Sequence, residues 1–122
     1  MALVLTSGCI RQNENPLSSE KVNFQLLIEA NGTEITKSID VNKGTNALEA
    51  MELLADVNYS TSAFGAFVTS INGIVNTSDS YWLFWIDGNF AEKAIDAYIV
   101  NKDTVVIWRF LGAEESKKFW GS

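Results

Sequence analysis

The 122-residue sequence contains no histidine, one cysteine and one proline. Because histidine is absent, the chain cannot form a Ser-His-Asp or Cys-His catalytic arrangement or an HExxH zinc site. The lone Cys9 excludes an internal disulfide and a cysteine-rich zinc or iron–sulfur centre. These absences argue against most hydrolase classes, and we expect neither catalytic residues nor a metal site.

An enzyme without histidine would have to use other groups, such as carboxylates, for acid–base chemistry. The candidates near expected turns are Asp79, Asp87, Glu92, Asp96 and Asp103. None of these residues belongs to an Asp-rich segment with the spacing of a calcium-binding loop. We therefore interpret them as solvated carboxylates on turns and keep catalysis as the weaker hypothesis.

Basic residues are also few. The chain has 9 Lys and Arg residues against 15 Asp and Glu residues, which gives a formal net charge of −6. Nucleic-acid binding draws most of its affinity from Lys and Arg on phosphates, and anionic lipid surfaces attract basic segments in the same way. The sequence therefore predicts no nucleic-acid partner and no electrostatic binding to a membrane surface.

What is present is typical of one globular domain. The hydrophobic fraction is 47% and the charged fraction is 20%, both ordinary for a folded protein. A chain of this length can bury roughly two thirds of its unfolded surface, which is enough for a core without disulfides or metal ions. We expect a single domain over residues 21–112, with a tail at 113–122.

The first twenty residues differ from the rest. Leu5 to Cys9, with the sequence LTSGC, looks like a lipobox, in which small residues precede a cysteine that receives a lipid. Residues 10–20 are polar and contain the only proline, as in a tether. We interpret residues 1–20 as a truncated lipoprotein signal and flexible tether, which predicts an extracellular, lipid-anchored protein. A lone reactive cysteine is the alternative interpretation.

Hydrophobic periodicity predicts the first elements. Residues 22–29 alternate between apolar and polar side chains, as in a half-buried strand. Asn31-Gly32 is a strong signal for a type I′ hairpin turn, and it leads into a second strand over residues 35–41. Lys37 falls on the inward face of that strand, which predicts a position near the edge of the sheet.

A helix is expected next. Asn46 is a suitable N-cap, and Glu49 stands where a capping partner is found. Leu48, Met51 and Leu54 recur at helical spacing, so we expect a helix that ends near Val57. Residues 58–63 are expected to form a loop.

The stretch from Phe67 to Gly88 carries the strongest strand signals. We expect strands over residues 64–71 and 81–86 and interpret them as the central antiparallel part of one small sheet. The second strand, YWLFWI, is apolar on both faces, as in a strand covered on both sides. An irregular crossover with one helical turn follows at 89–101, and a last strand is expected at 104–111.

The expected order is two strands, one helix, two strands, an irregular segment and a final strand. A hairpin, a helix that crosses one face and further strands make up the β-grasp plan. We therefore predict an α+β fold of the β-grasp type, with one helix packed on a mixed sheet of about five strands.

Four pieces of sequence also resemble a known family. They are GTNALEA from Gly44, FVTSINGI from Phe67, YWLFWIDG from Tyr81, and AYIV from Ala97 with VVIW from Val105. Together they resemble the C-terminal β-grasp domain of transcobalamin and intrinsic factor, and the stand-alone bacterial and archaeal domains related to it. With the opening hairpin, the resemblance covers about three quarters of the chain.

The resemblance implies non-covalent ligand binding, with cobalamin or a related corrinoid as the candidate ligand. In the cobalamin carriers this domain closes over the corrinoid against a separate helical domain, so a second domain supplied by another protein is a further expectation. A cell-surface structural or adhesion domain, in contact with protein or polysaccharide, is the alternative.

We expect the ligand to contact the aromatic strand and the neighbouring turn tips, because aromatic faces suit flat conjugated molecules and sugar rings. Trp82 and Trp85 point to opposite faces of their strand, so at least one of these indoles must belong to the core. The candidate ligand-binding residues are Asn72, Gly73, Trp82, Trp85, Asp87, Gly88, Phe90 and Tyr98.

Overall fold

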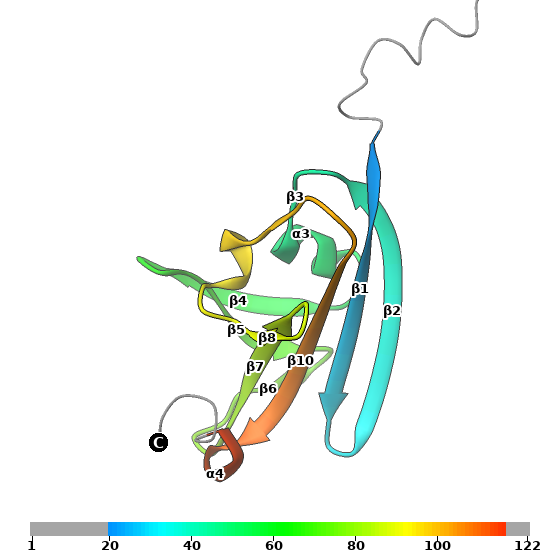
Figure 1. Ribbon diagram of the computed structural model, residues 1–122. Coiled ribbons are helices and arrows are strands. Elements are labelled where there is room, and N and C mark those ends of the chain that lie inside the picture. The colour runs from blue at the N-terminus through cyan, green and yellow to red at the C-terminus, as the bar shows by residue number, and fades with distance from the viewer. Residues whose placement is uncertain (1–19, 117–122) are drawn as a thin grey trace, which may run out of the picture.

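The computed structural model describes residues 20–116, so Cys9 and the sequence features after Ser116 lie outside the described residues. A five-stranded sheet has the order β2-β1-β10-β7-β8 (Figure 1). Its central pair, β1 and β10, is parallel and its other pairs are antiparallel, so the expected mixed sheet of about five strands is confirmed. The strands are β1 (Lys21–Ala30), β2 (Thr33–Asn42), β7 (Ser80–Ile86), β8 (Asn89–Phe90) and β10 (Thr104–Gly112).

The alternation of side chains gives this sheet one core face. Phe24, Leu26 and Ile28 of β1 are all buried. Leu26 lies beside Val106, and Ile28 lies beside Trp108, whose other neighbour in the register is Phe84. Asn31 and Gly32 adopt φ of 52° and 81°, as the predicted hairpin turn requires, and β2 forms the expected edge of the sheet.

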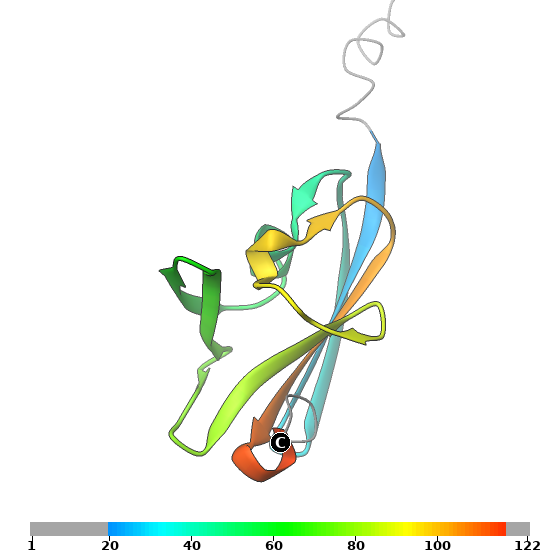
Figure 2. The ribbon, with the colours of Figure 1, turned by 60° about the vertical axis from the view of Figure 1, so that its left-hand side comes forward.

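The remaining elements pack on that core face. They are β3 (Thr45–Asn46), α3 (Ala47–Glu52), β4 (Val57–Ser62), β5 (Gly65–Ile71), β6 (Ile74–Val75), η2 (Ile95–Ala97) and β9 (Ile99–Val100). Figure 2 shows α3 and η2 on one side of the long sheet, with the β4–β5 hairpin projecting beyond them. The short helix α4 (Ala113–Ser116) follows β10 directly. No helix among the described residues is long and apolar enough to cross a membrane.

Helix α3 begins as predicted but ends early. The side chain of Asn46 accepts hydrogen bonds from the backbone N–H of Leu48 at 2.7 Å and of Glu49 at 3.4 Å. The helix ends at Glu52, so the prediction of a helix to near Val57 is wrong. The loop expected at 58–63 is also wrong, because these residues lie largely in β4. Backbone pairing of β4 with β5 satisfies their N–H and C=O groups instead.

The interpretation of residues 67–88 as part of one sheet is wrong as well. Strand β5 belongs to a separate sheet of order β4-β5-β6, whereas β7 pairs with β10 and β8. Strand β10 pairs along the whole of β7, and β8 pairs with Trp85 and Ile86 on its other edge. Asn76 joins the two sheets, since its side chain donates to the carbonyl of Val68 at 3.1 Å and accepts from the N–H of Trp82 at 2.9 Å.

We call residues 57–71, which form β4, β5 and their connecting turn, the arm. A close contact anchors it to η2 and to Ala94 just before it. The carboxylate of Asp96 accepts a hydrogen bond from the N–H of Ala66 at 3.0 Å, and the Asp96 carbonyl accepts one from Asn46 Nδ2 at 3.0 Å. A Cβ at Gly65 would lie 2.7 Å from both Ala94 Cβ and Asp96 Oδ1. The arm can approach this closely only because residue 65 has no side chain.

Gly65→Ala should therefore destabilise the fold by about 2–3 kcal/mol, because steric overlap adds to the backbone strain of an alanine at φ +113°. Gly44→Ala is the matched control, since Gly44 also has a positive φ but its added Cβ would meet nothing within 4 Å. The measurement is the free energy of unfolding from urea denaturation. Equal losses in the two variants would contradict the tight contact at Gly65.

Candidate ligand-binding groove

A groove of about 870 Å³ lies between the arm, strand β7 and residues 90–97, which we call the rim loop. Six aromatic residues line it, together with small apolar residues of the arm and the rim loop. A concave site with a mostly apolar lining and few polar groups is the usual form of a small-molecule site. The aromatic lining residues are Phe64, Phe67, Trp82, Phe84, Phe90 and Trp108.

The floor of the groove is formed by Trp82, Phe84 and Trp108 on the core face of the five-stranded sheet. Phe84 stacks on Trp108 with ring centroids 4.5 Å apart. Trp82 packs against Phe110 at 5.1 Å and donates its Nε1–H to the carbonyl of Ile74 at 2.8 Å. These contacts hold the floor in place before any ligand arrives.

The arm supplies one wall. Phe64, near its tip, is 91% exposed, and Phe67 on β5 is 55% exposed. Both residues line the groove, as do the exposed Ser60 and Ser62. Phenylalanine at such exposure leaves a large apolar surface in water, which a bound ligand would cover.

The rim loop supplies the opposite wall, and contacts with Tyr98 hold the loop in place. The Tyr98 hydroxyl accepts a hydrogen bond from the N–H of Glu92 at 2.9 Å. Lys93 Nζ lies 5.1 Å from the centroid of the Tyr98 ring, and that ring meets Phe84 edge-on at 5.9 Å. Tyr98 thus positions the rim loop without lining the groove itself.

The residues that the sequence predicts for the site do not lie together in the structure. Trp82 and Phe90 line the groove. Trp85 is buried like Trp82, but it lies on the opposite face of β7, where Phe90 packs at 5.3 Å and the Arg109 guanidinium lies 4.7 Å from its centroid. Glu29 accepts a hydrogen bond from Arg109 at 3.1 Å and so holds that cation in place.

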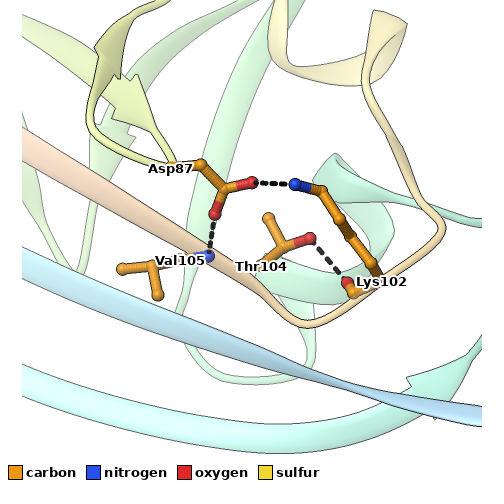
Figure 3. A network of polar contacts seen from close by, with 4 residues as sticks. All are labelled: Asp87, Lys102, Thr104 and Val105. Carbon is orange, nitrogen blue, oxygen red and sulfur yellow. Dashed lines mark hydrogen bonds and ion pairs between the residues drawn. The ribbon is translucent and has the colours of Figure 1, made fainter.

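Asp87 and Gly88 form the β7–β8 turn and are not among the groove residues. The N–H of Asp87 donates to the carbonyl of Val105 at 2.8 Å, and its Oδ1 accepts from the N–H of Val105 at 2.9 Å. Figure 3 shows the other carboxylate oxygen directed to Lys102, whose Nζ lies 3.5 Å away. Asp87 therefore fastens the turn to the start of β10.

Asn72 and Gly73 form the β5–β6 turn, also outside the groove. Asn72 has φ of 51° and Gly73 has φ of 85°, as a type I′ turn requires. The N–H of Asn72 donates to the carbonyl of Asp56 at 2.7 Å, while Asn72 Oδ1 accepts from the N–H of Asp56 at 2.9 Å. This reciprocal pair closes the base of the arm.

Sequence reasoning missed Phe64, Phe67, Phe84 and Trp108 as lining residues. Phe64 carried a usable signal, because a large apolar side chain directly before a glycine at a turn has no strand partner to bury it. Phe67, Phe84 and Trp108 carried none, since their positions in strands are equally typical of core residues.

Another hollow, of about 660 Å³, lies at the β1–β2 turn and the end of β10. Its lining is rich in turn residues and charged groups, including Glu29, Glu34, Arg109 and Glu115. Within residues 20–116, no group of three Cys, Asp or Glu side chains is placed to hold a metal ion. The aromatic groove is therefore the better candidate for a ligand site.

Comparison with solved structures gives the class of domain. The chain is similar to haptocorrin in a complex with Cbi, with a TM-score of 0.68 at 16% sequence identity over 76% of this chain and 25% of the haptocorrin chain. It is also similar to a proposed metal-binding protein from Ruminococcus gnavus, with a TM-score of 0.66 at 14% identity over 75% of this chain and 98% of that one. The resemblance to the C-terminal domain of the transcobalamin family is therefore confirmed at the level of the fold.

The sequence then gives the family. The profile named "Domain of unknown function (DUF4430)" matches residues 44–112, and the chain belongs to this family. A search of curated proteins found no match. The chain spans about a quarter of the length of the haptocorrin chain that it resembles.

The placement of Asp87 makes it a structural residue, which mutation can test. Asp87→Ala removes the acceptor for the N–H of Val105 and should lower the free energy of unfolding by about 1–2 kcal/mol. Asp87→Asn keeps an acceptor oxygen and loses only the contact with Lys102, whose side chain is 77% exposed, so its loss should stay below about 0.5 kcal/mol. Urea denaturation measures both, and similar losses would contradict this role.

Proposed function

We propose that the protein is a non-catalytic binding module that holds a flat, largely apolar small molecule in the aromatic groove. The observation that carries the proposal is the pairing of a fixed floor with an open wall. Trp82, Phe84 and Trp108 are held by internal contacts, while Phe64 and Phe67 stay exposed above them. A ligand would cover these exposed rings at little cost in reorganisation of the floor.

A corrinoid is the candidate ligand that we favour. Haptocorrin, which shares the fold at 16% identity, was solved in complex with Cbi. The similar protein from Ruminococcus gnavus is named for metal binding, but the described residues of this chain offer no ligand cluster for a metal ion. An extended aromatic groove suits a planar macrocycle better than a bare cation.

The groove is open, so this chain alone would enclose only part of a corrinoid. Small-molecule sites usually bury most of their ligand's surface. The chain corresponds to a quarter of haptocorrin, and we propose that a second domain, supplied by another protein, completes the site. Without it, affinity for a corrinoid should be modest.

We also propose the finer assignments of fold and location. The fold is of the β-grasp type, which the hairpin β1–β2, the helix α3 across one face and the parallel β1–β10 pair support. Export and lipid anchoring through Cys9 rest on the LTSGC sequence alone. The groove would then be presented outside the cell on a short tether.

A cell-surface adhesion domain is the second candidate. It is favoured by one observation: Phe64, Phe67 and Tyr59 of the arm are exposed by 91%, 55% and 42%. Such a group of apolar side chains is also typical of a surface that contacts protein or polysaccharide. The two functions differ in whether a small molecule quenches the groove tryptophans.

Titration with dicyanocobinamide, followed by inner-filter-corrected tryptophan fluorescence and by calorimetry, should show saturable binding. Phe64→Ser should weaken that binding by about tenfold or more, because the ligand loses its apolar contact with one wall. Leu53→Ser is the matched control, since Leu53 is 62% exposed and lies outside the groove. Both variants should keep wild-type stability.

The absence of binding up to millimolar dicyanocobinamide would contradict the corrinoid proposal. Equal weakening by Phe64→Ser and Leu53→Ser would contradict the assignment of the groove as the site. Binding of a polysaccharide or of a protein that depends on Phe64, without any response to the corrinoid, would favour the adhesion function.

A further inference from the structure

Trp108 carries a buried N–H group that its surroundings do not satisfy. The side chain is 3% exposed, and its Nε1 is the one buried side-chain nitrogen or oxygen without a hydrogen-bond partner within residues 20–116. Trp82, on the floor of the same groove, donates its own Nε1–H to the carbonyl of Ile74 at 2.8 Å. Two tryptophans thus line one groove, one with a paired N–H and one without.

An unpaired buried N–H is unusual, because tryptophan normally finds an acceptor when it is buried. The neighbours of Trp108 in the sheet register are Ile28 and Phe84, neither of which has a side-chain acceptor. A phenylalanine at position 108 would keep an aromatic ring there without a buried donor. Stability alone therefore does not account for an indole at this position.

The groove offers the route by which an acceptor could arrive from outside the chain, since Trp108 is one of its lining residues. Nε1 itself is buried, so an acceptor that enters from the groove reaches it only with a small shift of the floor, where the Phe84 ring stacks on Trp108 at 4.5 Å. Sites of this kind use a small number of polar groups to fix the orientation of an apolar ligand.

The charges around the groove limit the type of acceptor. Among the described lining residues only Glu92 and Lys93 are charged, and both are exposed on the rim loop with opposite signs. The floor therefore holds no cation that would balance a carboxylate or a phosphate. An anionic group beside Trp108 would lose its hydration without gaining a countercharge, which is unfavourable in an apolar site.

We infer that the ligand of the groove inserts a neutral carbonyl or amide oxygen that accepts a hydrogen bond from Trp108 Nε1. The inference rests on the proposed function, because it requires that the groove binds a small molecule. It adds a selection rule: among flat apolar molecules of equal size, those with such an oxygen at the inserted edge bind better. Trp108 is then the residue that determines this preference.

The test uses two probes of nearly the same shape, fluorene and fluoren-9-one, which differ by one carbonyl oxygen. Fluorenone should bind about threefold to tenfold more tightly than fluorene, the range expected for one net hydrogen bond. Affinities come from titrations followed by ¹H–¹⁵N spectra of the full chain. The indole N–H signal of Trp108 should move downfield with fluorenone and not with fluorene.

An isosteric replacement isolates the N–H group. β-(3-Benzothienyl)alanine in place of Trp108 keeps the fused ring and replaces the N–H by sulfur, so the preference for fluorenone should disappear while fluorene binds as before. The same replacement at Trp82 is the matched control. Its N–H is already paired with Ile74, so the preference for fluorenone should remain.

Each outcome separates this inference from the proposed function. If both probes shift groove signals but bind equally, or if the preference survives replacement of Trp108, the inference is wrong and the groove remains a ligand site. If neither probe shifts any groove signal, both the inference and the groove are contradicted. Failure of dicyanocobinamide alone would remove the corrinoid and leave the selection rule standing.

Discussion

The parallel pairing of β1 with β10 in the middle of the sheet is the constraint on which the rest of the structure depends. Phe24 lies beside Thr104 in this pair, so strands from the two ends of the described chain lie side by side. A parallel pair needs a crossover connection. With β2 and the β7–β8 hairpin in the outer positions, the intervening elements pack on one face, which becomes the core.

The groove exists because few residues of the chain cover the core face of the sheet. Helix α3 has six residues and η2 has three, and they seal the part of the core that contains Met51 and Ile95. Neither α3 nor α4 contributes a lining residue to the groove over Trp82 and Phe84. The arm contacts η2 at Gly65 and Ala66, and from that junction it forms one wall of the groove.

Local features of this fold could be predicted from the sequence, but the assignment of strands to sheets could not. The turns at Asn31 and Asn72 and the cap at Asn46 depend on adjacent residues, and the structure contains them. Strands β5 and β7 lie in different sheets because strands distant in sequence pair with β7. The alternation of apolar and polar side chains along β7 would be the same whichever strand paired with it, so the sequence pattern could not predict the partner. The aromatic strand led to Trp82, yet the groove also needs Phe64 from the turn between β4 and β5.

The same strand shows why aromatic residues alone do not identify the ligand. Trp85 is covered on one face of β7, whereas Trp82 and Phe84 face both the core and the groove on the other. Core packing and ligand binding thus favour the same aromatic residue types along this strand. Sequence similarity to other proteins at these positions therefore shows a shared fold and does not identify a shared ligand. Polar groups distinguish core packing from ligand binding, because an unpaired hydrogen-bond donor is unfavourable in a core but can bind an acceptor of the ligand in a site. Trp108 Nε1 is such a position on the floor of the groove.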